Sequence, residues 1–451
     1  MNEKNLLSNP LLDNTSTSKE LRLKILDLVK LYSDEVHRKH DFIPGKTLIP
    51  VSGKVYDEKE LQMLVSSSLD FWLTTGRFNS EFEQNLSNFL QVNFTLTCNS
   101  GSSANLIALS SLTSNQLENK LNPKDEVITL AAGFPTTVNP IIQNNLIPVF
   151  VDVDLSTLSP KIDQIESIIS EKTKAIMIAH TLGNPYDAKK IQELCKKHNL
   201  WFIEDCCDAL GSKIHGKNVG TFGDISTLSF YPAHQITMGE GGAVFTNNSN
   251  LKRISESFRD WGRDCFCAPG KNDTCGKRFD WQLGDLPHGY DHKYTYSHVG
   301  YNLKITDMQA SVGLGQLQKL PEFIKLRQNN FSYLLEGLTS LEKYFILPTP
   351  TIHSEPSWFG FPITIRDTSV FSREKIIGFL ASKLIDTRPL FSGNITKQPY
   401  FKNIYYKISK DLDNTNKIMS DSFWIGIYPA ITFEMLDYVI KSFNEFINTY
   451  K

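Results

Sequence analysis

Near the start of the chain, hydrophobic residues recur at the three- and four-residue intervals of amphipathic helices. In residues 18–38 the apolar positions that recur at this spacing are Leu21, Ile25, Leu28, Val29, Tyr32 and Val36. Asp57 followed by Glu60 has the spacing of a capping box and predicts the start of a second helix. A third helix is expected around Phe82 and Leu86. Residues 1–17 carry no such pattern, and we expect them to form a loose arm.

From about residue 95, short apolar runs alternate with stretches of helical spacing. The apolar runs are expected to be strands and occupy residues 127–130, 147–151, 175–179, 200–203, 226–230 and 243–246. Segments 160–170 and 186–198 would supply helices between them. This alternation predicts an α/β fold in which helices cover both faces of a mostly parallel sheet.

The chain is therefore expected to have three parts. Residues 1–60 would form an N-terminal arm and helix, and residues 61–325 a large domain that contains the sheet. Residues 326–451 would form a small C-terminal domain, with a strand at 361–365 and helices near 373–384 and 433–449.

Composition narrows the class of protein. The 451 residues are 40% hydrophobic and 21% charged, which is ordinary for a globular protein. A formal net charge of −2 gives no general reason to expect nucleic acid or a membrane surface as partner. No apolar run approaches the roughly 18 residues of a membrane span, and the first residues lack the pattern of a signal peptide. We therefore expect a cytoplasmic protein.

Candidate site residues follow the predicted strands, because ligands of parallel sheets gather at the carboxyl ends of strands. The candidates are Gly101, Ser102 and Ser103 after a strand that ends at Cys98, Phe134 after the next strand, and Asp205 and Asp208 after residues 200–203. Small residues at a helix start let backbone N–H groups approach a phosphate. Taken singly, these residues also fit a plain helix-opening turn, a buried aromatic and helix caps.

The stretch from Ser226 to Val244, STLSFYPAHQITMGEGGAV, carries a more specific signal. It resembles the cofactor segment of the DegT/DnrJ/EryC1/StrS sugar aminotransferases, which have the aspartate aminotransferase fold (fold type I) and use pyridoxal phosphate (PLP). That family places a cofactor-binding lysine about five residues after the strand serine. Here Ser229 is followed at that distance by His234, and an imidazole cannot form a stable imine with an aldehyde. One branch of the family, the sugar-nucleotide 3-dehydratases, carries histidine there.

The resemblance implies a role for each candidate. Gly101, Ser102, Ser103 and Ser229 would hold the cofactor phosphate, and Phe134 would stack on the pyridine ring. Asp205 would face the ring nitrogen and keep it protonated, and Asp208 would contact the ring hydroxyl. His234 would be the catalytic base. Asn302, in the VGYN segment, would reach the phosphate of the partner subunit in a homodimer.

The chain has seven cysteines, and an odd number without an export signal argues against a disulfide framework. Three of them, at 265, 267 and 275, lie within eleven residues. They fit either uncoordinated thiols or a thiolate cluster for zinc or iron–sulfur, although the C-x₂-C spacing usual for zinc is absent. The spacing C-x₅₇-C-x-C-x₇-C from Cys207 to Cys275 resembles the [2Fe–2S] site of 3-dehydratases acting on CDP-4-keto-6-deoxyglucose. Cys206 is an alternative to Cys207.

By this resemblance the chain would work with pyridoxamine phosphate (PMP) and a [2Fe–2S] cluster bound by Cys207, Cys265, Cys267 and Cys275. It would remove the C3 hydroxyl of CDP-4-keto-6-deoxy-D-glucose in the synthesis of 3,6-dideoxyhexoses for lipopolysaccharide. Electrons would come from a separate NAD(P)H-dependent flavin or iron–sulfur reductase. Alternatives are a PLP-dependent nucleotide-sugar aminotransferase, a TDP- or GDP-linked 3-dehydratase, or a non-catalytic binding protein on the same fold.

Overall fold

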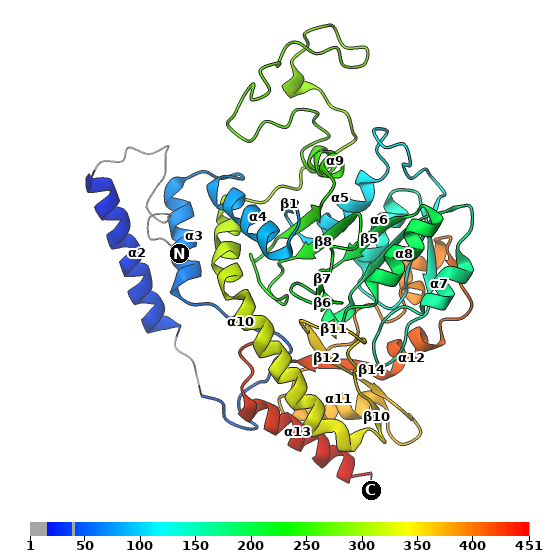
Figure 1. The fold of residues 1–451 in the computed structure, drawn as a ribbon. Coiled ribbons are helices and arrows are strands. Elements are labelled where there is room, and N and C mark those ends of the chain that lie inside the picture. The colour runs from blue at the N-terminus through cyan, green and yellow to red at the C-terminus, as the bar shows by residue number, and fades with distance from the viewer. Residues whose placement is uncertain (1–15, 38–40, 451) are drawn as a thin grey trace.

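A computed structural model describes residues 16–37 and 41–450. The expected loose arm falls mostly on residues 1–15, which lie outside the described residues. The remaining chain forms a large α/β body, a smaller region at its carboxyl-terminal side, and a segment that projects from the body (Figure 1).

The body is organised around an eight-stranded sheet with the strand order β1-β9-β8-β5-β4-β2-β3-β13. Its strands are β1 (Phe94–Cys98), β2 (Glu126–Leu130), β3 (Ile147–Val151), β4 (Thr173–Ala179), β5 (Trp201–Asp205), β8 (Ile225–Ser229), β9 (Gly242–Thr246) and β13 (Lys407–Ile408). Neighbours from β8 to β13 run parallel, whereas β9 is antiparallel to both β8 and β1. The expected mostly parallel sheet is confirmed.

Helices cover both faces of this sheet, because alternate strand residues face opposite sides. They include α5 (Gly101–Ser111), α6 (Pro135–Gln143), α7 (Ile162–Ile168), α8 (Ala188–His198) and α9 (Ser249–Arg259). In β4, Ile176 packs into a core shared with α4 (Arg77–Leu90) and α8, while Met177 packs into a separate core shared with α5 and α9. The strands are thus buried on both sides, which explains their continuous apolar runs.

The long helix α10 (Asp307–Leu338) leads from the body into the smaller region (Figure 1). That region has a three-stranded sheet of β10 (Phe345–Ile346), β12 (Gly360–Ile365) and β14 (Ser422–Gly426), with α11 (Arg373–Ser382), α12 (Asp413–Asp421) and α13 (Phe433–Asn448). A further small sheet contains β6 (Lys213–Ile214), β7 (Lys217–Asn218) and β11 (Ser354–Glu355). No helix within the described residues is long and apolar enough to cross a bilayer.

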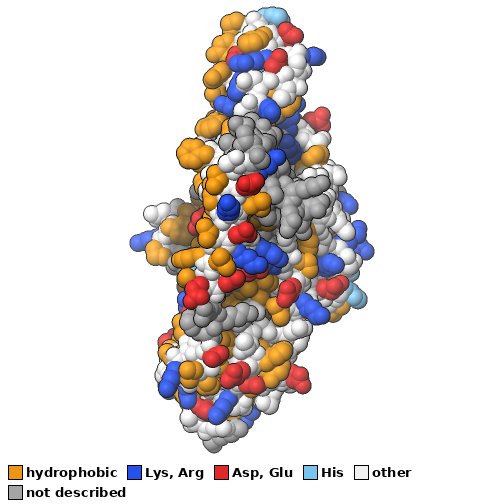
Figure 2. Space-filling view, turned by 90° about the vertical axis from the view of Figure 1, so that its left-hand side faces the viewer, with side chains coloured by type: hydrophobic (Ala, Val, Ile, Leu, Met, Phe, Trp, Pro, Cys, Tyr) orange, Lys and Arg blue, Asp and Glu red, His pale blue; other side chains and the backbone are white. Residues whose placement is uncertain are grey.

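Two N-terminal helices pack against α10, namely α3 (Glu58–Asp70) and α4 (Arg77–Leu90), and a third, α2 (Ser16–Val36), lies on the outer side of α3 (Figure 1). The predicted capping box of Asp57 and Glu60 is present at the start of α3. Helix α2 packs on α3 through a narrow strip that includes a 2.8 Å ion pair between Arg22 and Asp70. Its apolar stripe faces outward instead, with Leu28 64% and Tyr32 61% exposed, on the side of the molecule seen in Figure 2.

Residues 263–298, which we call the projecting segment, extend beyond α9 at one end of the molecule (Figure 1). Their two ends meet at Gly262 and Gly300, which approach so closely that a side chain at either would overlap backbone atoms. Apart from one short 3₁₀ turn at His292–Tyr294, the segment has no helix or strand.

Within the projecting segment, side-chain contacts replace regular structure. Arg278 forms two hydrogen bonds to Asp291, at 2.8 and 2.6 Å. Asp264 pairs with the buried His292 at 2.6 Å and accepts a hydrogen bond from Ser297 at 2.7 Å. These contacts within the segment hold it in a defined conformation.

Candidate active site

The carboxyl ends of β4, β5 and β8 open onto a cavity of about 660 Å³. Most residues singled out from the sequence line it: Gly101, Ser102, Phe134, Asp205, Asp208, Ser229 and His234. The parallel sheet therefore brings together residues that are far apart in the chain. Ser103 lies just behind the wall, where its amide donates to the hydroxyl of the N-cap residue Ser100 at 3.1 Å. Asn302 does not line the cavity and instead forms a β-bridge with Asp260.

One end of the cavity has the features of an anion site. Helix α5 begins there, and backbone N–H groups at the start of a helix attract negative charge. A side chain at Gly101 would meet Ser229 Oγ at 2.8 Å and Cys207 Sγ at 3.0 Å, so only glycine allows this close packing. Ser102 donates a hydrogen bond to Thr136 Oγ1 at 3.2 Å. These residues fit a phosphate group.

The carboxylate of Asp205 is fixed in the cavity wall. It is 4% exposed, and its Oδ2 accepts hydrogen bonds from Asn105 Nδ2 at 2.8 Å and Thr137 Oγ1 at 2.7 Å. Its Oδ1 accepts the N–H of Cys207 at 3.0 Å. Such a carboxylate suits a protonated ring nitrogen, and the exposed ring of Phe134 in the same cavity suits stacking on that ring. The cavity therefore fits a pyridoxal-type cofactor.

His234 presents a neutral imidazole to the cavity. Its Nδ1 lies 3.6 Å from Asp208 Oδ1, too far for a hydrogen bond, and has no other partner. Burial lowers the pKa of His234 to about 4. Burial and then the nearby Asp205 raise the pKa of Asp208 to about 7. The backbone around His234 is held by Arg327, whose Nη2 donates to the His234 carbonyl oxygen at 3.2 Å.

Several cavity residues were not predicted from strand ends. They are Tyr231, Phe359, Arg388, Phe391 and Trp424. Four of them come from the region after α10, whose approach to the sheet no local pattern predicts. Phe391 has a left-handed backbone with φ of 47°, a conformation that is uncommon for an aromatic residue. Three of these residues lie in the stretches RPLFSGNIT and FWIGIYP. These stretches were the signal in the sequence that could have identified them.

Three of the four predicted cluster cysteines come together. Cys265, Cys267 and Cys275 line a small pocket in the projecting segment, along with Arg278 and Lys293 among others. Burial raises the pKa of Cys267, but this is outweighed by a 3.0 Å hydrogen bond with Thr274 and the charge of Lys293, which leave that pKa below its usual range.

Cys207 does not line that pocket but the cofactor cavity. There burial, with the charge of Asp205 as the next cause, raises its pKa well above the usual range. All seven cysteines are free thiols. One subunit therefore does not present the four cysteines as a single set of ligands, and the cluster fits this subunit only in part.

A different group of three ligand-type side chains is buried at the carboxyl ends of the central strands β4 and β5. Atoms of His180, Glu204 and Cys206 lie within 4.8 Å of one another. The Glu204 carboxylate already accepts the N–H groups of Gly220, Phe222 and Gly223, and it pairs with His180 Nε2 at 3.1 Å. Its acceptor capacity is thus used by the protein, and we interpret the group as a structural network. Cys206 belongs to this group and lines neither the cavity nor the pocket of the projecting segment.

Comparison with known proteins extends over most of the chain. The profile of the DegT/DnrJ/EryC1/StrS aminotransferase family matches residues 55–444. The lipopolysaccharide biosynthesis protein RfbH of Salmonella typhimurium is 58% identical over 431 residues, covering 95% of this chain and 99% of that protein. A dTDP-4-dehydro-2,6-dideoxy-D-glucose 3-dehydratase of Saccharopolyspora spinosa is 49% identical over 439 residues, covering 96% of this chain and 95% of that protein.

A solved structure shares the fold. The GDP-4-keto-6-deoxy-D-mannose 3-dehydratase of E. coli, determined with bound hydrated PLP, has a TM-score of 0.79 and 27% identity to this chain. The match covers 87% of this chain and 98% of that one. The expected aminotransferase-like fold is therefore confirmed.

Proposed function

The chain belongs to the DegT/DnrJ/EryC1/StrS aminotransferase family, and from that premise we propose that it is a PMP-dependent nucleotide-sugar 3-dehydratase. Membership makes it an enzyme of a PLP- or PMP-using family that acts on nucleotide sugars in deoxysugar biosynthesis. What remains to be decided is which reaction it catalyses and on which nucleotide sugar.

The observation that carries the proposal is His234. It lines the cavity at the position where the family resemblance expects a lysine, and none of the residues that line this cavity is a lysine. A lysine would bind the aldehyde form of the cofactor covalently, whereas an imidazole leaves the amine form free and still moves protons near neutral pH. This arrangement favours dehydration over amino transfer.

When bound, PMP supplies a free amine for the C4 ketone of the sugar and a ring that accepts electrons. The start of α5 and Ser229 would hold its phosphate, and Asp205 would keep its ring nitrogen protonated. The neutral imidazole of His234 accepts the proton whose removal accompanies loss of the C3 hydroxyl. Asp208, 3.6 Å from Nδ1, then stabilises the positive charge on His234.

We further propose CDP-4-keto-6-deoxyglucose as substrate and a [2Fe–2S] cluster as a second cofactor. The cysteine spacing supports both, since it resembles the cluster site of CDP-linked enzymes. Reduction after loss of the hydroxyl requires electrons that PMP does not provide, so the proposal includes a reductase partner. The proposal also includes the homodimer that the resemblance implies for Asn302.

The test compares three nucleotide sugars. Purified protein with PMP and a flavin reductase is given the CDP-, dTDP- or GDP-linked 4-keto-6-deoxyhexose, and the product is identified by mass spectrometry. A 3-deoxy product from the CDP-linked sugar is expected. Without reductase, oxygen from labelled water should enter the C3 hydroxyl through reversible elimination. If no sugar gives either result, the proposed function is wrong.

The aminotransferase alternative makes the opposite prediction. Given PLP and glutamate, it would convert the 4-keto sugar to a 4-amino sugar without any reductase. It would also carry a protein-bound imine that borohydride reduces. We expect neither, because no lysine lines the cavity.

A further inference from the structure

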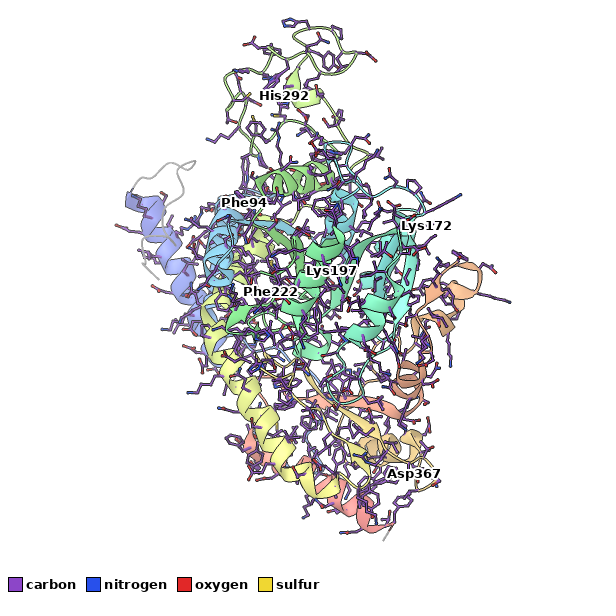
Figure 3. All side chains as sticks on the ribbon, turned by 45° about the vertical axis from the view of Figure 1, so that its right-hand side comes forward. Phe94, Lys172, Lys197, Phe222, His292 and Asp367 are labelled. Carbon is purple, nitrogen blue, oxygen red and sulfur yellow. The ribbon has the colours of Figure 1, made fainter. Side chains whose placement is uncertain are left out.

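The cysteines that the proposed function assigns to one cluster lie in two separate places within the subunit. A [2Fe–2S] centre is held by four ligands, usually cysteine thiolates, that must converge on two iron atoms. Three cysteines line the pocket of the projecting segment, whereas Cys207 lines the cofactor cavity. Figure 3 shows His292, which lines the pocket of the three cysteines, at the projecting end of the molecule. Any complete site must bridge this separation.

Cys207 is fixed in the body. It lies two residues beyond the end of β5, and its N–H donates a hydrogen bond to Asp205, a residue that the cofactor site requires. Its sulfur also packs against the start of α5, as the close approach to Gly101 shows. Moving Cys207 toward the projecting segment would dismantle the cofactor cavity.

The projecting segment is fixed at its base. Trp261 N–H donates to the Tyr301 carbonyl at 2.5 Å, and Tyr301 N–H donates to the Phe258 carbonyl at 2.7 Å. The His298 ring is held on both sides, by Ser114 at 2.7 Å and Ser257 at 2.8 Å. Folding the segment back over its own cavity would break these bonds.

A further contact holds the cysteine loop beside its own chain. Gly270, between Cys267 and Cys275, packs on Trp72, with the indole ring 2.9 Å from the position that a side chain would take. Trp72 lies between α3 and α4 and does not line the cofactor cavity. The loop is therefore packed against a part of its own subunit other than the cavity.

Both places also expose apolar surface. At the base of the segment Val299 is 92% exposed, and Tyr294 and Tyr296 are more than half exposed. In the cavity, Tyr231 is 52% exposed. Covering such patches is favourable, and in a twofold dimer the same pair of surfaces meets twice.

We propose that each cluster is assembled between two subunits, with Cys207 from one and Cys265, Cys267 and Cys275 from the projecting segment of its partner. A homodimer would then hold two equivalent sites, and neither would be complete in a single subunit. This inference rests on the proposed function, because it concerns the cluster that the function requires. It adds that the cluster and the cofactor it serves are brought together by dimerisation.

The experiment uses pairs of differently tagged subunits that are co-expressed, so that heterodimers form during assembly and are isolated by both tags in turn. The readouts are iron and acid-labile sulfide content and the visible absorbance of the cluster, under anaerobic conditions. Gel filtration and thermal melting check that each variant folds as a dimer. Activity is not needed.

In the first pair, one subunit carries Cys207→Ser and the other Cys267→Ser. If ligands come from both subunits, one site of this heterodimer keeps all four cysteines, and about half the wild-type iron and sulfide is expected. If all four ligands came from one subunit, both sites would be defective and the heterodimer would lack the cluster. That result would overturn the proposal.

For the second pair the two arrangements of ligands predict the opposite results to those for the first pair. Misfolding of a variant therefore cannot produce the expected result in both pairs. One subunit carries both Cys207→Ser and Cys267→Ser, and the other is wild type. The proposal predicts no cluster, because each site then lacks one ligand, whereas ligands from a single subunit would leave about half. A half-loaded second heterodimer therefore also overturns it.

Two homodimers complete the set. Cys206→Ser is the matched control beside Cys207 and should keep the full cluster, while the Cys207→Ser homodimer should have none. A fully loaded Cys207→Ser homodimer would remove Cys207 from the ligands and refute the inference. If the wild-type protein contains no iron and sulfide, the cluster itself is refuted. This result would be a failure of the proposed function, and it would be seen before any variant is made.

Discussion

Lowering the pH tests whether the buried imidazole of His234 is the base for elimination. Only the neutral imidazole accepts a proton, so the rate falls as pH drops through the pKa of the folded protein. Burial places that pKa at about 4, against 6.5 for an ordinary histidine. The difference corresponds to about 3 kcal/mol of cost for charging the buried ring.

The two values predict clearly different rates at pH 5.5. A histidine with a pKa of 6.5 would be about nine-tenths protonated, and elimination would run about tenfold slower than at high pH. With a pKa of about 4, about 97% of the imidazole stays neutral and the rate is nearly unchanged. The acid limb of the profile should therefore lie near pH 4 instead of near 6.5.

The assay is exchange of oxygen from labelled water into the C3 hydroxyl, with saturating PMP and no reductase, from pH 5.0 to 8.0. Protein held at pH 5.5 and returned to pH 7.5 should recover its full rate, which separates titration from denaturation. Asp208, with a pKa of about 7, can add a limb of its own. That limb should vanish in Asp208→Asn. A half-maximal rate near pH 6.5 that persists in Asp208→Asn would refute the assignment of His234 as a buried neutral base.

Four substitutions test the remaining assignments. His234→Lys should bind PLP covalently, as trapped by borohydride, and should slow oxygen exchange by about 10²–10⁴-fold; exchange at the parent rate would contradict the role of His234. Gly101→Ala should weaken PMP binding at least tenfold because its methyl group overlaps neighbouring side chains, while Gly378→Ala, in α11 away from the cavity and with nothing within 4 Å, should bind normally; equal affinities in a titration would argue against the phosphate site. Asp205→Asn should slow both exchange and 3-deoxysugar formation at least tenfold, and an unaltered rate of either would count against the ring-nitrogen contact. Cys267→Ser should lose the cluster absorbance and 3-deoxysugar formation but keep oxygen exchange; product at the parent rate would remove the cluster from the reduction.

The sequence predicts which residues line the cavity where the sheet determines their placement. Asp205 ends β5, and Phe134 and Gly101 follow β2 and β1, so the placement of the strands brings these residues to one cavity. The strands themselves were recognisable because burial on both faces requires continuous apolar runs. The fold class and the cavity residues near the strand ends therefore followed from local patterns.

Contacts between distant parts of the chain were not predictable in the same way. The low pKa of His234 arises from burial in a cavity that Phe359 and Trp424 help to close, and both come from the region after α10. The apolar stripe of α2 predicted a helix but not its orientation, because the side that packs on α3 is the one with Arg22, paired with Asp70, and the stripe faces outward. Periodicity indicates that a face is apolar and does not identify what covers it.

The cysteine spacing has the same limit, because it does not show which residues meet in space. Cys207 follows Asp205 by two residues at the end of β5, and both side chains line the cofactor cavity. Its distance along the chain from Cys265 says nothing about whether the two meet within one subunit or between two. None of the residues that line the cofactor cavity comes from the projecting segment. Loss of the proposed cluster from that segment should therefore leave in place the residues to which we assign cofactor binding and proton transfer. For this reason elimination and reduction should be separable by a single substitution at Cys267, whereas a substitution at Asp205 should impair both.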